Sequence, residues 1–210
     1  MTSTSTLARA ARLGSTRKRG VTLIEAVLYI SIALALIVGG LVFFQQASLA
    51  QRTNSAVRNI SAIASETRGL YQQQNNFSGF TQSSLINAGA VPTSLIGGTA
   101  AAPTLINEWG GLITAAPNAA LTSPDLAANA GFTVIYPSLP TAACVRLTST
   151  DASGTGRVGS GIRSIAFKQG GAATWGNEVL PGSLSPSDVA AATLCGQTGG
   201  IADVRFTFLR

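Results

Sequence analysis

The chain has 210 residues, of which 46% are hydrophobic and only 10% are charged, whereas a soluble domain usually carries about a quarter charged residues. It contains no histidine, which excludes His-dependent nucleophilic catalysis and His-containing zinc sites. Five of its fourteen cations lie in the first twenty residues, leaving nine against eight acids, so the net charge of +6 does not indicate a nucleic-acid partner.

The first segment of the chain is basic and ends at Gly20. Beyond the apolar stretch that follows it, only Arg52 and Arg58 stand near the other end. Because basic residues stay on the cytoplasmic side of a membrane, this asymmetry predicts a cytoplasmic N-terminus and a translocated remainder. The cations of the first segment are Arg9, Arg12, Arg17, Lys18 and Arg19.

Residues 21–44 form an apolar stretch that carries one acid, Glu25. As a helix it would extend for about 36 Å, enough to cross a hydrocarbon core of about 30 Å. Three fates are open: a cleaved secretory signal ending at Ser48-Leu49-Ala50, a permanent anchor, or an anchor that later leaves the bilayer. A secretory signal has an apolar core of only about 7–15 residues, which disfavours the first.

The helical pattern continues beyond the apolar stretch. Apolar and small residues recur at spacings of three and four from Ala56 to Tyr71, and no proline interrupts them. We therefore expect one helix from near Thr22 to about Gln73, apolar all round in its first half and amphipathic in its second. Gly39-Gly40 is its weak point, because each glycine costs about 1 kcal/mol relative to alanine; a packing notch and a site of local unwinding are both open interpretations.

After Gln73 the composition shifts to residues typical of loops, and segments with strand character follow. We expect an α+β fold in which an antiparallel β-sheet covers the second half of the long helix. The aromatic face of the last strand, Phe206 and Phe208, should pack on that helix. The expected strands are Gly111–Thr114, Phe132–Tyr136, Val145–Thr148, Ile162–Lys168 and Val204–Leu209.

Two cysteines, Cys144 and Cys195, stand far apart and late in the chain. One disulfide in an oxidising compartment is the simple interpretation, and two buried thiols are the alternative. A short helix from about Pro186 to Leu194, with Ser185 as its N-cap, would bring Cys195 toward Cys144.

Several features imitate functional sites. Residues 154–159 spell G-x-G-x-x-G, but the strand-like segment after them favours a surface loop or hairpin over a dinucleotide site. Trp109 and Trp175 each stand beside glycine, which favours packing or loop pinning over contact with a sugar or a neighbouring subunit. The acids are scattered singly and do not form a calcium-binding D-x-D-x-D group, so no metal or cofactor is predicted.

The stretch "RKRG" followed by "VTLIEAVLYI" resembles the prepilin processing site of type IV pilins. The resemblance implies that a prepilin peptidase in the membrane cuts between Gly20 and Val21 and that the new amino terminus is then methylated. It divides the chain into a leader (1–20), a long helix (21–75) whose residues 21–44 are first transmembrane and then the filament core, and a globular head (76–210) whose C-terminal region a disulfide closes.

Four stretches from Gly69 onward resemble type IVb pilins, in particular those of conjugative thin pili: "GLYQQQNNFSGF", "LINAGAVPTSL", "NEWGGLITAAP" and "FTVIYPSLPTAACVRL". The long leader and Val21 at the new first position also point to the type IVb branch. Val21 leaves the extent of methylation open.

Glu25 has two interpretations. It lies in the first turn of the predicted helix, where a carboxylate favours the helix dipole. The resemblance implies a second role, in which Glu25 of an incoming subunit neutralises the freed Val21 amine of a neighbour. A wrong axial offset would leave both charges buried and unpaired, so the pair would select the register of assembly.

These observations predict a structural subunit of a type IVb pilus and no enzyme. It would be inserted in the bacterial inner membrane, in contact with lipid and with the pilus assembly machinery, and then polymerise as a homo-oligomeric helical filament for adhesion or conjugative mating contact. The alternatives are a type II secretion pseudopilin and a secreted binding domain with an ordinary signal peptide.

Overall fold

A computed structural model describes residues 20, 22–122, 125–149, 156–159, 161–169, 174–190, 194–196 and 199–210. The chain divides within the first helix into two units, of which the second is residues 46–210; from here on the head means residues 46–210. The helices are α1 (Leu23–Leu70), α2 (Gln82–Asn87), α3 (Thr141–Thr148) and α4 (Pro186–Val189), with 3-10 turns η1 (Thr93–Leu95) and η2 (Pro181–Ser183). The strands are β1 (Ile96–Thr99), β2 (Ala102–Ile106), β3 (Leu112–Pro117), β4 (Leu121–Thr122), β5 (Asp125–Leu126), β6 (Gly131–Pro140), β7 (Ile162–Gln169) and β8 (Ile201–Leu209).

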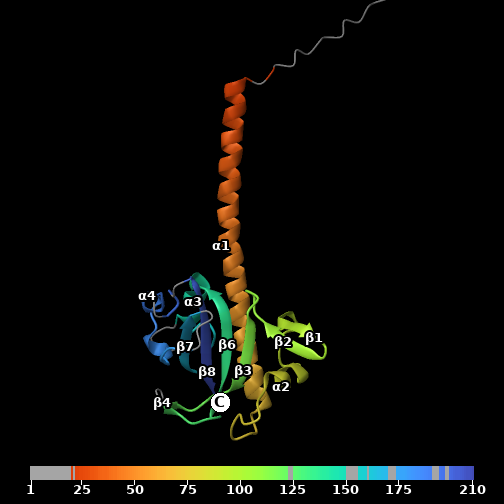
Figure 1. Ribbon diagram of the computed structural model, residues 1–210, viewed down its shortest axis with the longest axis vertical. Helices are drawn as coiled ribbons and strands as arrows, with labels where there is room; N and C mark the ends of the chain where they lie inside the picture. The colour runs from red at the N-terminus through yellow and green to blue at the C-terminus, as the bar shows by residue number, and fades with distance from the viewer. Residues whose placement is uncertain are drawn as a thin grey trace, which may run out of the picture. The chain divides into compact units, whose positions relative to one another are not determined.

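The predicted long helix is present as α1, 48 residues long (Figure 1). In the head part of α1 one stripe is buried, and its spacing of three and four residues is the period of a helix packed on one face. Chain direction changes after Gly69, whose carbonyl accepts a turn hydrogen bond from the Gln72 amide. The buried stripe comprises Thr53, Ala56, Ile60, Ile63, Ala64 and Thr67.

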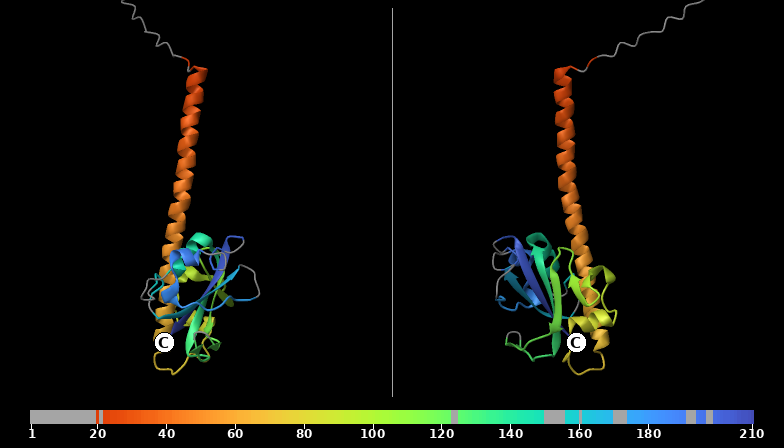
Figure 2. Two further views of the ribbon diagram at one scale, coloured as in Figure 1. Left: turned by 90° about the vertical axis from the view of Figure 1, so that its left-hand side faces the viewer. Right: turned by 45° about the vertical axis from the view of Figure 1, so that its right-hand side comes forward.

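The head contains a six-stranded antiparallel sheet in the order β1-β2-β3-β6-β8-β7. Strand β8 lies between β6 and β7 and pairs along almost its whole length with both. Figure 2 shows from two further sides how this sheet lies beside the head part of α1. The predicted α+β fold with an antiparallel sheet on the long helix is therefore confirmed.

An aromatic cluster joins the sheet to the helix. Phe206 and Phe208 are fully buried, and the Phe208 ring stacks on Phe132 with centroids 5.2 Å apart. From α1, the Arg68 guanidinium lies 5.5 Å from the Phe208 ring centroid, and its Nε donates to the Leu209 carbonyl at 2.9 Å. Each fully buried phenylalanine contributes roughly 1.5–3 kcal/mol, so the last strand anchors the sheet on α1 as predicted.

The predicted strand Val145–Thr148 is wrong, because these residues lie in helix α3. Val145 and Leu147 alternate with polar neighbours, which imitates a strand. The buried side chains are instead Ala143, Cys144, Leu147 and Thr148, which is the spacing of one helix face. Pro140 precedes the helix, where its fixed φ and missing N–H cost little.

Helix α4 begins where predicted but is shorter. Ser185 is its N-cap and forms a capping box with Asp188, while Leu194 lies in a turn outside the helix.

Strands β1 and β2 were not predicted, because Gly97-Gly98 and Pro103 are residues typical of turns. Gly98 has a φ of +79° and would bring a Cβ within 2.5 Å of the Ala102 carbonyl, so this tight hairpin requires glycine.

The segment after β7 pairs with this edge strand of the sheet. Gly176 donates its amide to the Phe167 carbonyl at 2.9 Å, and Val179 pairs with Ile165 through two backbone hydrogen bonds. Trp175 lies under two cations, Lys168 and Arg205, at 5.0 Å and 4.7 Å from its ring centroid. Trp175 thus pins a loop onto β7 and β8, which protects the edge strand from further pairing.

Candidate assembly and processing site

The first part of α1, residues 23–44, exposes its apolar side chains. Its large hydrophobic residues from Leu23 to Phe44 are between 51% and 84% exposed. We call these residues the apolar segment. Monomeric soluble proteins rarely leave such a continuous apolar surface uncovered, and one of this extent marks contact with a membrane or with other protein chains.

By length and composition, α1 is a helix that could cross a membrane. A window of 18 of its residues has a mean hydropathy of 2.6, and none of that window is buried. Gly39 and Gly40 lie inside this continuous helix, and a Cβ at either position would meet nothing within 4 Å. A notch for packing against a neighbouring helix and a site of local unwinding therefore both remain predictions for this glycine pair. A helix packed into the notch would have to come from another molecule.

Glu25 lies in the first turn of α1, where the helix dipole favours a carboxylate. Its amide donates to the Thr22 hydroxyl at 3.4 Å, which places Thr22 in the capping position before Leu23. The Tyr29 hydroxyl, one turn further on, donates to Glu25 Oε1 at 3.2 Å. Sequence reasoning missed Tyr29, although its i, i+4 spacing from Glu25 was the available signal.

Gly20 is exposed and precedes the helix, in backbone without regular structure. A peptide bond in such a segment is accessible to a peptidase. Its predicted partner in the processing site, Val21, lies outside the described residues, as does the leader up to residue 19. Cleavage after Gly20 and pairing of Glu25 with the freed amine remain predictions.

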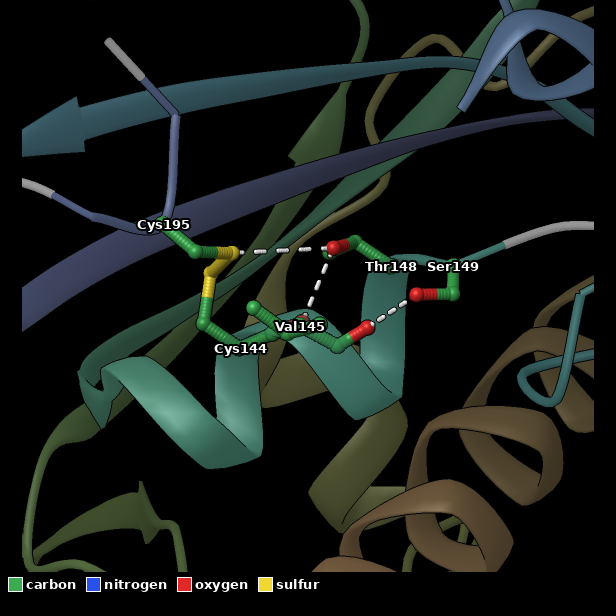
Figure 3. Close-up of a disulfide and its surroundings, with 5 residues drawn as sticks. All are labelled: Cys144, Val145, Thr148, Ser149 and Cys195. Carbon is green, nitrogen blue, oxygen red and sulfur yellow. Dashed lines mark hydrogen bonds between the residues drawn. A yellow bond between two sulfur atoms is a disulfide. The ribbon is translucent and has the colours of Figure 1, made fainter. Parts of the chain in front are cut away.

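The two cysteines form the predicted disulfide, Cys144–Cys195, with Cα atoms 5.6 Å apart (Figure 3). Both are fully buried. Thr148 on α3 donates its hydroxyl to the Cys144 carbonyl at 2.8 Å and lies 3.7 Å from the Cys195 sulfur. The Cys195 amide donates to the Val189 carbonyl at 2.9 Å, so the bond joins α3 to the end of α4.

The features that imitate other sites have structural roles. Gly156 and Gly159 close a small turn ahead of β7, as a hairpin interpretation predicts, while Gly154 and Thr155 lie outside the described residues. Trp109 packs against the core. Within the part of the chain that the structure describes, no three acidic or cysteine side chains gather closely enough to hold a metal ion.

A partly buried polar contact between α1 and the β2–β3 turn was not predicted. Asn59 donates to Glu108 Oε1 at 2.6 Å, while Glu108 Oε2 and the Tyr136 hydroxyl are buried with no hydrogen-bond partner among the described residues. Burial raises the pKa of Glu108 above its ordinary value, although hydrogen bonds from its own backbone and Asn59 oppose the shift. The only signal for this contact was the turn sequence "NEWGG" itself.

The chain is similar to pilus proteins along most of its length. A family model described as PilS N terminal matches residues 50–207. The major structural subunit of bundle-forming pilus from Escherichia coli O111:H- is 25% identical over 191 residues, which covers 90% of this chain and 93% of that protein. The protein of the same name from Escherichia coli O127:H6 is 26% identical over 195 residues, with the same coverage of 90% and 93%.

The fold is also similar to that of a solved structure. The crystal structure of type IV b pilin from Salmonella typhi matches with a TM-score of 0.53 and 24% sequence identity. The match covers 73% of this chain and 97% of that one.

Proposed function

The chain belongs to the PilS N-terminal family and is a type IVb pilin; from this premise we propose that it polymerises into an extracellular pilus as a structural subunit. Such a subunit is a non-enzymatic protein whose activity is assembly. The names of its relatives, major structural subunits of bundle-forming pili, favour the major subunit.

The exposed apolar segment is the observation that supports this proposal most strongly. In one chain its large apolar side chains are more than half exposed, so they need an apolar environment. The inner membrane supplies lipid before assembly, with the N-terminus on the cytoplasmic side. The filament then supplies the apolar segments of other copies, through a heterologous contact that repeats without closing.

Maturation exposes the group that Glu25 needs. A prepilin peptidase cuts between Gly20 and Val21, and the freed amine of Val21 becomes the partner of Glu25 on another copy. Two opposite charges in a medium of low dielectric attract strongly and are costly when separated. The assembly machinery in the inner membrane then extrudes subunits in one register. The pilus serves adhesion or conjugative mating contact.

Intact mass spectrometry of the protein from filaments tests this function. A mass that lacks residues 1–20, with or without one methyl group, and surface filaments in electron micrographs are expected. Loss of about fifty residues would instead indicate a secretory signal that ends near Ala50 and would contradict the proposal. Correct cleavage without surface filaments would favour the type II secretion pseudopilin.

A further inference from the structure

A basic pocket of about 380 Å³ opens on the head, lined by Ala50, Thr53, Asn54, Arg146 and Arg157. Its positive charge comes from two arginines, and its described lining includes no acidic residue. The Thr53 hydroxyl is already used, because it donates to the Leu49 carbonyl at 2.8 Å. The available donors are therefore the two guanidinium groups and the Asn54 amide.

The backbone behind each arginine is held in place. Arg146 lies on α3 between the buried residues Cys144 and Leu147, and the disulfide ties this helix to Cys195. Arg157 lies in a turn whose Val158 is buried. The Val158 carbonyl accepts a hydrogen bond from Ser61 of α1 at 2.9 Å. Two segments whose arginines are eleven residues apart in the chain thus present their cations to one face of α1.

Both arginines are exposed and free to bind an anion. The ion pairs within the described residues join Lys168 to Asp203 and Arg205 to Glu178, and within the same residues no hydrogen bond involves the side chain of either pocket arginine. Guanidinium groups bind phosphate oxygens through paired hydrogen bonds, so phosphate is the chemistry that this pocket fits.

The position of the pocket along the chain identifies the source of the phosphate. Ala50 follows Phe44, the last large residue of the apolar segment, by six residues of continuous helix, a rise of about 9 Å. A bilayer has a headgroup layer of several ångströms beyond its hydrocarbon core, and arginine side chains extend toward that layer. We propose that Arg146, Arg157 and Asn54 bind the phosphate of an anionic phospholipid before assembly, an inference that rests on the proposed membrane-inserted stage.

The test uses the full chain in micelles of a neutral detergent, which have no surface potential of their own. Binding of phosphatidylglycerol is measured by native mass spectrometry for the wild type and for Arg146→Gln with Arg157→Gln. We expect the double variant to bind about 30-fold more weakly, since each basic residue beside an anionic lipid contributes about fivefold. Arg157→Lys, which keeps the charge but loses the planar fork, should fall between them.

The matched control, Arg52→Gln with Arg58→Gln, removes the same charge from the nearby part of α1 without altering the pocket lining. It should change lipid binding by less than about threefold. If both double variants weakened lipid binding equally, the effect would come from surface charge in general, and the proposal that the pocket binds the lipid would be overturned. If glycerol phosphate bound as tightly as phosphatidylglycerol, the pocket would recognise phosphate alone, and the proposal that the phosphate belongs to a lipid would be overturned.

Unchanged lipid binding together with fewer filaments in the Arg146→Gln, Arg157→Gln variant would also overturn the proposal and assign the pocket to an acidic residue of a neighbouring copy. Flotation of the wild-type chain with neutral vesicles is the separate check on membrane insertion. Failure to float would contradict the proposed function, whereas floating without a preference for the anionic lipid would contradict only this inference.

Discussion

Glu25 and Glu108 are two carboxylates in very different surroundings. Glu25 is exposed at the first turn of α1 and accepts one hydrogen bond from Tyr29. Glu108 is half-buried in the head; one oxygen accepts a hydrogen bond from Asn59, and the other has no partner in the part of the chain that the structure describes. The first is therefore available to another molecule, whereas the second acts on the stability of its own head.

Replacing Glu25 by Gln should reduce pilus assembly without unfolding the head. Gln keeps the hydrogen bond with Tyr29 but cannot neutralise an amine buried in the filament core. Filament yield, measured by electron microscopy and by the sheared pilin fraction, should fall at least about tenfold. Tyr29→Phe is the matched control, because it removes only the hydroxyl contact. Normal filaments from Glu25→Gln would end the charge-pairing hypothesis.

Replacing Glu108 by Gln should remove a pH-dependent loss of stability. Because burial raises the pKa of Glu108 in the folded chain, the folded state holds its proton to higher pH than the unfolded chain does. Stability is then fully present below the unfolded pKa, about 4.3, and is lost as the pH rises through the folded value. Glu108→Gln should thus be more stable than the wild type at neutral pH and similar to it near pH 4.

Urea unfolding of the full chain at these two pH values measures the effect. Gln can still accept the hydrogen bond from Asn59, so the comparison isolates the charge. Asp125→Asn, at an exposed acid, is the control and should leave the difference between the two pH values unchanged. A Glu108→Gln variant that is less stable than the wild type at neutral pH would contradict the prediction.

Among the elements, α3 and α4 depend most on a covalent bond. Cys144 of α3 and Cys195 in the turn beyond α4 are 51 residues apart in the chain, and closing a loop of this length restricts the unfolded state by roughly 4 kcal/mol. Cys144→Ser with Cys195→Ser should therefore lower the free energy of unfolding by about 2–4 kcal/mol.

Denaturant unfolding of the full chain, oxidised and reduced, measures this loss. The reduced wild type and the double variant should have similar stability, and reductant should leave the variant unchanged. If the variant were as stable as the oxidised wild type, the fold around α3 would not depend on the bond.

Elements with a long, consistent period were the most predictable from sequence. Helix α1 has both an apolar run and a clear stripe of three- and four-residue spacing, and β8 alternates Phe206 and Phe208 with smaller or polar residues. Residues 145–148 misled because four residues are too few to distinguish periods of 2 and 3.6. The β1–β2 hairpin was missed because the Gly97-Gly98 pair in β1 is locally typical of a loop.

The candidate site divides in the same way. Gly20, Val21 and Glu25 are close in sequence and form a motif, so they could be found without coordinates. The Asn59–Glu108 contact joins residues 49 apart, and Ser61 bonds Val158 across 97. Such contacts depend on how the sheet docks on α1, and no local pattern encodes that docking.

At the scale of the whole molecule, the head should fold without the apolar segment. Residues 46–210 form a compact unit that contains the aromatic cluster, the sheet and the disulfide. A chain that begins at Gln46 should be a soluble, cooperatively folded monomer that forms no filaments.

Sedimentation and circular dichroism of that shortened chain check this prediction. A double variant of it, Phe206→Ala with Phe208→Ala, is the control and should unfold at much lower denaturant, since each buried aromatic costs about 3–5 kcal/mol when truncated. Filaments from the shortened chain would mean that the apolar segment is not the assembly surface.

The place of β8 has a consequence for biosynthesis. It is the last described element in the chain, yet it lies between β6 and β7. A ribosome therefore delivers both flanking strands before the strand that joins them, while α1 emerges first. The apolar helix can reach the membrane long before the sheet can close. Until residues 201–209 are translated, β6 and β7 lack the strand that pairs with both of them, and the unfinished head is accessible to proteases and chaperones.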